Sequence, residues 1–198
     1  MKDLVIIDSG GANIASLVYA LERLGCSAHV SGDPDEIRAA ARVILPGVGA
    51  AADAMARLES HGLVDLVPRL TQPLLGICLG MQLLFESSEE GATRCLGVFP
   101  GAVRRFEASP GMPVPHMGWN SLHALAPHPL LAGVSAGDYA YFVHSYAAPV
   151  GPHTLARCEY GLEFSAVVGR GNFVATQFHP ERSAAVGARI LANFLDMT

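Results

Sequence analysis

In the first half of the chain, short apolar runs alternate with segments in which apolar residues recur every three or four positions. The first run covers residues 4–7, and the helical pattern over residues 14–24 ends at Gly25, a typical helix-capping residue. Further strands are predicted at residues 28–30, 43–45 and 73–77. This alternation is typical of a parallel sheet with helices on both of its faces.

Two helical segments separate these later strands. One is entered through Asp33-Pro34, and the other extends over residues 51–70, where Pro68 is a candidate interruption. From about Leu96 onward the pattern changes to short β-like segments separated by Gly and Pro. We expect antiparallel or mixed strands there, at residues 139–147, 154–159 and 172–177, and a last helix that begins near Ser183.

Together these patterns predict one α/β domain that spans residues 1–198. The fold has a mostly parallel central sheet flanked by helices, with additional antiparallel or mixed strands in its second half. The 21 Gly and 13 Pro residues are dispersed as turn residues rather than gathered into a linker, so we expect no domain boundary.

Composition narrows the range of functions. The formal net charge is -5 and basic residues are not clustered, which argues against nucleic-acid binding. No apolar run approaches the ~20 residues that span a bilayer, and Asp8 interrupts the N-terminal run too early for a signal peptide. We therefore expect a cytoplasmic protein with no membrane partner.

The four cysteines are Cys26, Cys78, Cys95 and Cys158, and no two of them form a Cys-x-x-Cys pair. This spacing argues against a zinc site and against a disulfide framework, and we expect no metal and no cofactor. Three of them read as small buried hydrophobic residues. Cys78 alone has a sequence context that suggests chemistry.

Cys78 lies between an apolar strand and a segment of helix-forming residues, within Gly76-Ile77-Cys78-Leu79-Gly80. Glycines two residues to either side are the spacing of a nucleophile elbow, in which a sharp turn exposes the central side chain. The turn also points that side chain at a helix N-terminus, which favours thiolate over thiol. On the elbow alone, a buried cysteine in a tight turn remains an equal alternative.

A candidate base occurs near the C-terminus, in His179-Pro180-Glu181. Pro180 favours an extended backbone at His179, so the side chains two residues apart can meet on one side. A carboxylate bonded to one ring nitrogen leaves the other free to exchange a proton with Cys78. By itself, a loop histidine beside a turn proline would be the simpler interpretation.

A third element follows the strand at residues 43–45, where Pro46-Gly47-Val48-Gly49 forms a glycine-rich loop. Its backbone amides, together with the Leu79 amide at the helix start, are candidate donors to an oxyanion. An ordinary strand-to-helix turn is the alternative.

With Gly-Ile-Cys-Leu-Gly-Met-Gln, Phe-His-Pro-Glu and Pro-Gly-Val-Gly identified, the sequence resembles class I glutamine amidotransferases, from Leu4 to the last helix. The resemblance implies a flavodoxin-like glutaminase fold and a Cys-His-Glu triad that hydrolyses glutamine to glutamate and ammonia through a Cys78 thioester. It also implies oxyanion donation by the amides of Val48 and Leu79. The residues implied to contact glutamine are Gly49, Gln82, Ser145 and Tyr146.

Within that family, the chain looks most similar to the glutaminase subunits of imidazole glycerol phosphate synthase. The features are Asp8-x-Gly10-x-x-Asn13-x-x-Ser16, the Pro-Gly-Val-Gly loop, Pro115-His116-Met117-Gly118-Trp119-Asn120 and His144-Ser145-Tyr146. Such a subunit passes ammonia to a (β/α)8-barrel cyclase, as a heterodimer, in histidine biosynthesis. The residues implied at the interface are Asn13, His116, Met117, Trp119, Asn120 and Arg182.

Three positions depart from the pattern of these subunits. Ser9 and Ala12 replace an aromatic residue and a glycine found in many members, and Arg182 replaces a lysine. Two other interpretations remain open. The chain could serve another class I glutaminase pathway, which its Pro-Gly-Val-Gly and His-Met-Gly-Trp-Asn motifs disfavour, or it could be a non-catalytic regulatory module that retains the fold.

Overall fold

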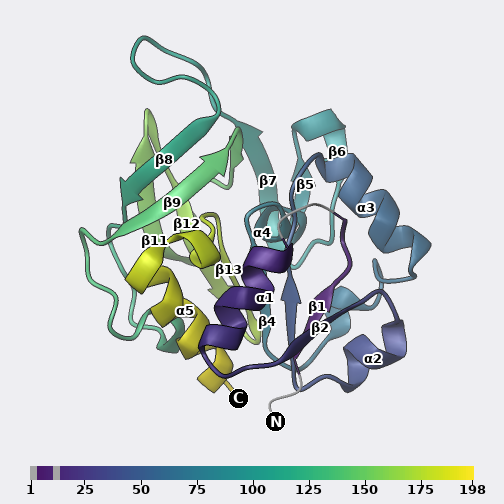
Figure 1. Ribbon diagram of the computed structural model, residues 1–198. Helices are drawn as coiled ribbons and strands as arrows, with labels where there is room; N and C mark the ends of the chain where they lie inside the picture. Colours follow the sequence, from purple (N-terminus) through teal and green to yellow (C-terminus); the bar gives the residue numbers. More distant parts are fainter. Residues whose placement is uncertain (1–3, 11–13) are drawn as a thin grey trace.

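The computed structural model describes residues 4–10 and 14–198, and its first half alternates strands and helices as predicted (Figure 1). The elements of this half are β1 (Leu4–Ile7), α1 (Ile14–Arg23), β2 (Ala28–Ser31), α2 (Pro34–Ala39), β3 (Arg42–Leu45), α3 (Ala51–Ser60), η1 (Val67–Arg69), β4 (Leu74–Ile77) and α4 (Leu79–Leu83). The predicted helix entry at Asp33 is confirmed, because its side chain accepts hydrogen bonds from the first two backbone amides of α2 that follow Pro34.

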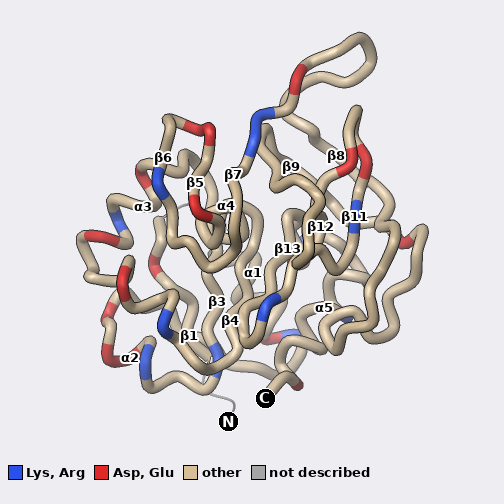
Figure 2. The backbone as a smooth tube through the Cα atoms, turned by 180° about the vertical axis from the view of Figure 1, so that it is seen from behind, with Lys and Arg blue, Asp and Glu red and all other residues tan. Residues whose placement is uncertain are grey.

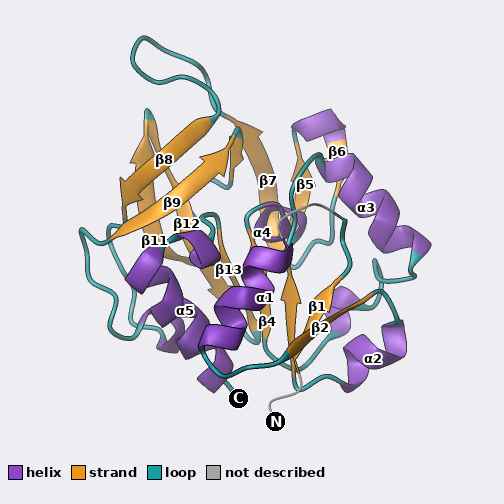
Figure 3. Ribbon diagram, in the orientation of Figure 1, coloured by secondary structure: helices purple, strands orange, loops and turns teal. Residues whose placement is uncertain are grey.

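The second half consists mainly of strands (Figure 3). Its elements are β5 (Phe85–Ser88), η2 (Glu90–Ala92), β6 (Thr93–Arg94), β7 (Phe99–Arg105), β8 (His116–Ser121), η3 (Pro129–Leu131), β9 (Tyr139–His144), β10 (Tyr146–Ala147), β11 (Thr154–Tyr160), β12 (Leu162–Arg170), β13 (Phe173–Thr176), η4 (Pro180–Arg182) and α5 (Ala184–Asp196).

The central sheet has seven strands in the order β11-β12-β13-β4-β3-β1-β2. The five strands from β13 to β2 run parallel, whereas β11 and β12 extend the sheet by antiparallel pairing. A four-stranded sheet (β10-β7-β5-β6) and the β8-β9 hairpin complete the second half. The predicted α/β class, with its mostly parallel sheet and additional antiparallel strands, is confirmed.

Alternate residues of the central strands point to opposite faces of the sheet, and each face is covered by helices. On one face, Leu4 and Ile6 of β1 belong to the same apolar cluster as residues of α1 and α5. On the other face, Val5 and Ile7 cluster with residues of α2, α3 and α4. Burial of both faces explains why these strands are continuous apolar runs in the sequence.

Two helix predictions need correction. The segment at residues 51–70 is not one helix broken at Pro68, because α3 already ends at Ser60 and Gly62 follows with a φ of +69°. The helix after Cys78 is also shorter than the helix-forming residues suggest, since the chain enters β5 at Phe85. After α3, the left-handed Gly62 ends the helix. After α4, the pairing of β5 with β6 and β7 overrides helix propensity.

Charged residues of both signs are interspersed along the backbone (Figure 2), as the dispersed charges in the sequence indicate. Across residues 4–10 and 14–198, no helix combines the length and apolarity needed to span a bilayer.

The start of α4 lies directly against the end of β3. A Cβ atom at Gly80 would lie 1.8 Å from the carbonyl oxygen of Leu45, and one at Gly47 would lie 2.9 Å from the Gly80 nitrogen. Only residues without side chains permit this approach. The contact therefore sets the distance between the loop after β3 and the turn that contains Cys78.

We predict that Gly80→Ala destabilises the fold by several kcal/mol, because the clash is with backbone that cannot rotate away. Gly151→Ala is the matched control, since a Cβ there meets nothing within 4 Å. Urea unfolding of the two variants measures the difference. Equal stabilities would contradict a close-packing role for Gly80.

Candidate active site

Cys78 occupies the sharp turn between β4 and α4 that the sequence predicts. Its backbone has φ of 54° and ψ of -111°, a region that residues other than glycine rarely adopt, and Leu79 begins the helix. The Cys78 amide donates to the Thr176 carbonyl, which fixes the turn to the end of β13. Strain of this kind persists where surrounding structure enforces it, and it is common at functional sites.

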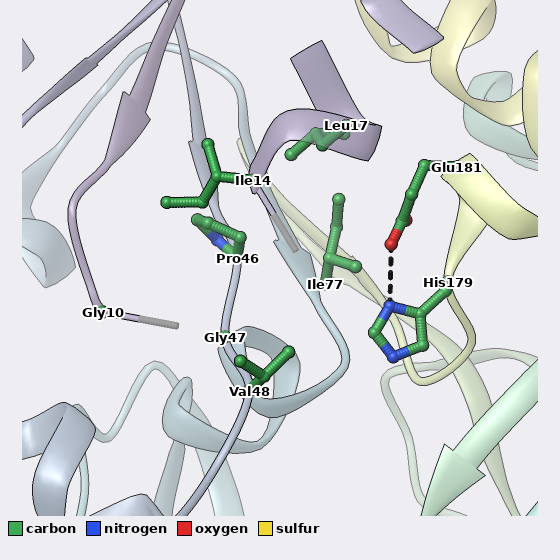
Figure 4. A pocket seen from close by; sticks show the side chains of 9 residues that line it. All are labelled: Gly10, Ile14, Leu17, Pro46, Gly47, Val48, Ile77, His179 and Glu181. Carbon is green, nitrogen blue, oxygen red and sulfur yellow. Dashed lines mark hydrogen bonds and ion pairs between the residues drawn. The ribbon is translucent and has the colours of Figure 1, made fainter. Parts of the chain in front are cut away.

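His179 and Glu181 lie together at the adjacent strand end (Figure 4). The extended backbone of His179, with φ of -92° and ψ of 100°, leads into η4, and Nδ1 of the ring lies 2.9 Å from Oε1 of Glu181. Because a carboxylate accepts, Nδ1 carries the proton and Nε2 is left to interact with Cys78, which lines the same cavity as His179. The three predicted triad residues are thus neighbours.

The electrostatics of this group favour a charged imidazole. Burial lowers the pKa of His179, but hydrogen bonds to Cys78 and Glu181 and the negative charges of both raise it to about 10. These interactions favour a protonated imidazole held between the Cys78 sulfur and the Glu181 carboxylate. This arrangement places the sulfur beside an acid that can protonate a leaving amine.

Strand β9 holds the His179 turn in place. The His179 amide donates to the carbonyl of Tyr141, and the Tyr141 amide donates to the hydroxyl of Ser183. The last helix was predicted to begin near Ser183, and α5 does begin at Ala184. The hydroxyl of Ser183, however, donates to the His179 carbonyl at 2.7 Å and caps no helix amide. Ser183 therefore stabilises the turn rather than the helix start.

The glycine-rich loop after β3 lies beside the same turn. Gly47 packs against Leu79 and Gly80, and Gly49 adopts a φ of +91°. The Ser9 hydroxyl donates to the Pro46 carbonyl at 2.6 Å, which fastens the start of the loop to the end of β1. The structure therefore brings the Val48 segment next to the first turn of α4, where the sequence predicts the oxyanion donors.

A cavity of about 340 Å³ opens over the sulfur, within the range of small-molecule sites. It is lined by all of the predicted oxyanion and substrate positions: Val48, Gly49, Leu79, Gln82, Ser145 and Tyr146. Cys78 and His179 line it as well. Parallel strand ends and the β9-β10 junction thus converge on one chamber.

Three polar residues of this site are not among those predicted from the sequence: Glu90, His144 and Gln177. Glu90 lines the cavity and accepts from the Ala51 amide at 2.8 Å. Gln177 is completely buried, and its carboxamide nitrogen lies 3.9 Å from the Cys78 sulfur. The sequence does contain a signal for Gln177, because it is a polar residue within the apolar run that leads to His179. A buried polar side chain requires a hydrogen-bond partner.

A second, smaller cavity lies on the Glu181 side of the pair (Figure 4). Its volume of about 20 Å³ is enough for roughly one water-sized molecule. Ile14, Leu17 and Ile77 give it a mostly apolar lining. The buried ion pair is therefore screened from bulk water on this side by aliphatic side chains.

The residues predicted at a partner interface are only partly at the surface. Met117 and Trp119 are 63% and 52% exposed, and Arg182 stacks over Tyr141, whose ring also contacts Trp119. His116 in contrast is 3% exposed and faces inward. The side chain of Asn120 donates to the carbonyl of Glu159. Asn13 lies outside the described residues.

His116 and His144 form a buried pair, and His144 also lines the cavity over Cys78. Burial lowers the pKa of His116 to about 4. Burial, together with the positive charges of His116 and His179, lowers that of His144 to about 3, although the backbone hydrogen bond with Tyr146 opposes this. Within residues 4–10 and 14–198, no group of three or more His, Cys, Asp or Glu side chains is arranged to hold a metal ion.

We predict that stability falls as the pH drops from 6.5 to 5. Between these pH values the two histidines become protonated only in the unfolded state, because their pKa values in the folded state are lower. This lowers the free energy of unfolding by about 2 kcal/mol for each histidine. Urea unfolding at both pH values tests this. In His116→Phe, the free energy of unfolding should decrease about half as much between the two pH values. Imidazole nitrogen NMR signals that show protonation of both rings near pH 6.5 would contradict the prediction.

Comparison with known proteins agrees with this geometry. Residues 5–197 match the family Glutamine amidotransferase class-I. The chain is 57% identical to the imidazole glycerol phosphate synthase subunit HisH of Xanthomonas campestris pv. campestris (strain 8004), covering 100% of this chain and 99% of that relative. It is 55% identical to the subunit of the same name from Xylella fastidiosa (strain Temecula1), covering 100% and 98%.

A solved structure supports the fold independently. The crystal structure of a glutamine amidotransferase matches with a TM-score of 0.75 at 20% identity, covering 98% of this chain and 97% of that one. The resemblance inferred from the motifs is confirmed. The chain belongs to the class-I glutamine amidotransferase family and, within it, to the HisH subunits of imidazole glycerol phosphate synthase.

Proposed function

We propose that this chain hydrolyses glutamine to glutamate and ammonia, and that it supplies the ammonia to a cyclase subunit in histidine biosynthesis. The cyclase product would be imidazole glycerol phosphate, with aminoimidazole carboxamide ribotide released alongside it. The observation that carries the proposal is that Cys78 and His179 line one cavity, while Oε1 of Glu181 lies 2.9 Å from Nδ1 of the His179 ring. The full-length similarity to HisH supports the pathway.

Cys78 provides the nucleophile. His179 Nε2 takes the thiol proton, and the thiolate attacks the side-chain amide carbon of glutamine to give a tetrahedral oxyanion. The backbone amides of Val48 and Leu79 donate to that oxyanion, an interaction worth ~100- to 1000-fold per donor in other enzymes. The imidazolium then protonates the amine, so ammonia leaves and a thioester remains.

Water completes the cycle. His179 takes a proton from the water, which attacks the thioester through a second oxyanion, and the sulfur leaves as thiolate. Glu181 stays ionised throughout and stabilises the imidazolium through its 2.9 Å contact with Nδ1. The products are glutamate and a regenerated triad, so the reaction needs no cofactor.

The cavity lining suggests how glutamine is held. Gly49, Gln82, Ser145 and Tyr146 line the space around the sulfur, and we assign the amino-acid end of the substrate to them. Glu90 adds a carboxylate, which suits the α-ammonium group of an amino acid. This residue extends the set that the motifs suggest.

The outward face of the β8-β9 hairpin is the proposed docking surface for a (β/α)8-barrel cyclase, in a cytoplasmic heterodimer. Met117 and Trp119 expose large apolar side chains on it, and aromatic residues of this type are common interface anchors. Arg182 lies at its edge over Tyr141 and offers a planar guanidinium in place of the lysine of many relatives. His116 is no longer included, because its side chain is buried on the opposite face.

We expect Cys78→Ala to abolish ammonia release from glutamine, both with and without the cyclase, because no other group replaces the thiolate. The measurement is ammonia release by wild type and variant under both conditions. Cys26→Ala is the control, since Cys26 lies in the apolar cluster between α1 and the central sheet. Full activity in Cys78→Ala would end the nucleophile assignment.

The same experiment separates the competing functions. A histidine-pathway cyclase that neither binds the chain nor raises its glutamine hydrolysis would favour another glutaminase pathway. Absence of Cys78-dependent hydrolysis under every condition would favour a regulatory module that retains the fold.

Glu181→Gln should lower kcat about 100-fold or more and change KM for glutamine much less. The substitution removes the charge that supports the imidazolium but leaves the substrate cavity intact. Steady-state kinetics of the complex test this. Glu163→Gln, at an exposed ion pair with Arg157, should leave both constants unchanged. An effect on KM alone would remove Glu181 from the triad.

A further inference from the structure

A chain of hydrogen bonds runs beneath the cavity, from β8 to the segment that is proposed to hold glutamine. His116 Nδ1 lies 3.0 Å from His144 Nε2, and His144 Nδ1 lies 2.8 Å from the carbonyl oxygen of Tyr146. At the other end, Asn120 Nδ2 lies 3.3 Å from His116 Nε2. Both rings are buried, so water does not compete for these bonds.

The direction of every bond follows from the last one. A carbonyl oxygen can only accept, so His144 Nδ1 carries the proton. Because burial keeps the ring neutral, its Nε2 accepts from His116 Nδ1. His116 Nε2 in turn accepts from the amide of Asn120, whose second hydrogen goes to the Glu159 carbonyl. Both neutral histidines are therefore in the Nδ1-H form.

The carbonyl of Tyr146 also receives a bond from the catalytic side. Gln82 Nε2 donates to it at 2.8 Å and to Gln177 Oε1 at 3.1 Å. Gln177 then presents its own Nε2 toward the Cys78 sulfur. One backbone carbonyl thus joins the histidine pair to the residues that lie under the nucleophile.

Packing alone does not require a histidine at position 116. Its ring stacks on Tyr160 at 4.1 Å and on Phe142 at 5.1 Å, contacts that phenylalanine could also make. Burying imidazole carries a desolvation cost that an apolar ring would avoid. What histidine adds here is the Nδ1-H donor, aimed at His144.

We propose that His116 is a positioning residue for the glutamine site, acting through His144 to fix the Tyr146 carbonyl. This inference rests on the proposed glutaminase function. Ser145 and Tyr146 line the cavity directly beside the fixed carbonyl. Loss of the His116 donor leaves His144 Nε2 buried without its donor and loosens this segment, while the turn at His179 is held separately by Tyr141 and Ser183.

The test compares two variants in the complex with the cyclase. His116→Phe keeps the stacking and removes the donor, whereas His116→Asn places an amide N–H where Nδ1 was and loses most of the stacking. We expect His116→Phe to raise KM for glutamine about tenfold with kcat per active site within about threefold of wild type. His116→Asn should keep KM within about threefold of wild type.

Active sites are counted by alkylation of Cys78 with a chloroketone analogue of glutamine, so that a loss of folded protein is not read as a kinetic effect. If His116 has only a structural role, His116→Phe should resemble wild type more closely than His116→Asn does. The variants should then differ only in the number of active sites and not in KM. That order, or an unchanged KM in His116→Phe, would overturn the proposal.

A measurement on the wild-type chain covers the case in which a variant fails to fold. Imidazole nitrogen NMR should show His116 and His144 both in the Nδ1-H form, and Nε2-H forms would refute the chain of bonds. Neither result affects Cys78-dependent ammonia release by the wild type. Failure of that release would instead refute the proposed function itself.

Discussion

The close contact between Gly80 and the carbonyl of Leu45 is the constraint on which the site depends. It lets the first turn of α4 lie against the end of β3, so that the Cys78 turn and the loop containing Val48 share one edge of the sheet. Parallel pairing brings the end of β13 to the same edge, and His179 follows it. Three segments far apart in sequence thereby form one chamber.

Much of this arrangement could be predicted from the sequence, because it uses local signals. Three local signals restrict the backbone conformation almost independently of the rest of the chain. They are the apolar runs of the parallel strands, the glycines around Cys78 and the proline after His179. The positive φ of Cys78 and the 2.9 Å contact between His179 and Glu181 agree with those signals.

What could not be predicted depends on long-range contacts. The inward direction of His116, the role of the Ser183 hydroxyl and the position of Gln177 are decided by which strands pair across the second half of the chain. A motif gives the identity of these residues but not the face of the strand on which they lie. The β8-β9 pair makes this clear. On β8, the side chains of Met117 and Trp119 point outward to solvent, whereas that of His116 points inward to the core.

Neutrality of the histidine pair matters for the neighbouring His179. His144 interacts electrostatically with His179, so a proton on His144 would oppose the positive charge that His179 needs beside the sulfur. Burial keeps His144 uncharged, so of these two rings only His179 carries positive charge beside the Cys78 sulfur. The site thus uses two kinds of buried histidine: His179, held charged by a carboxylate, and His144, held neutral by burial.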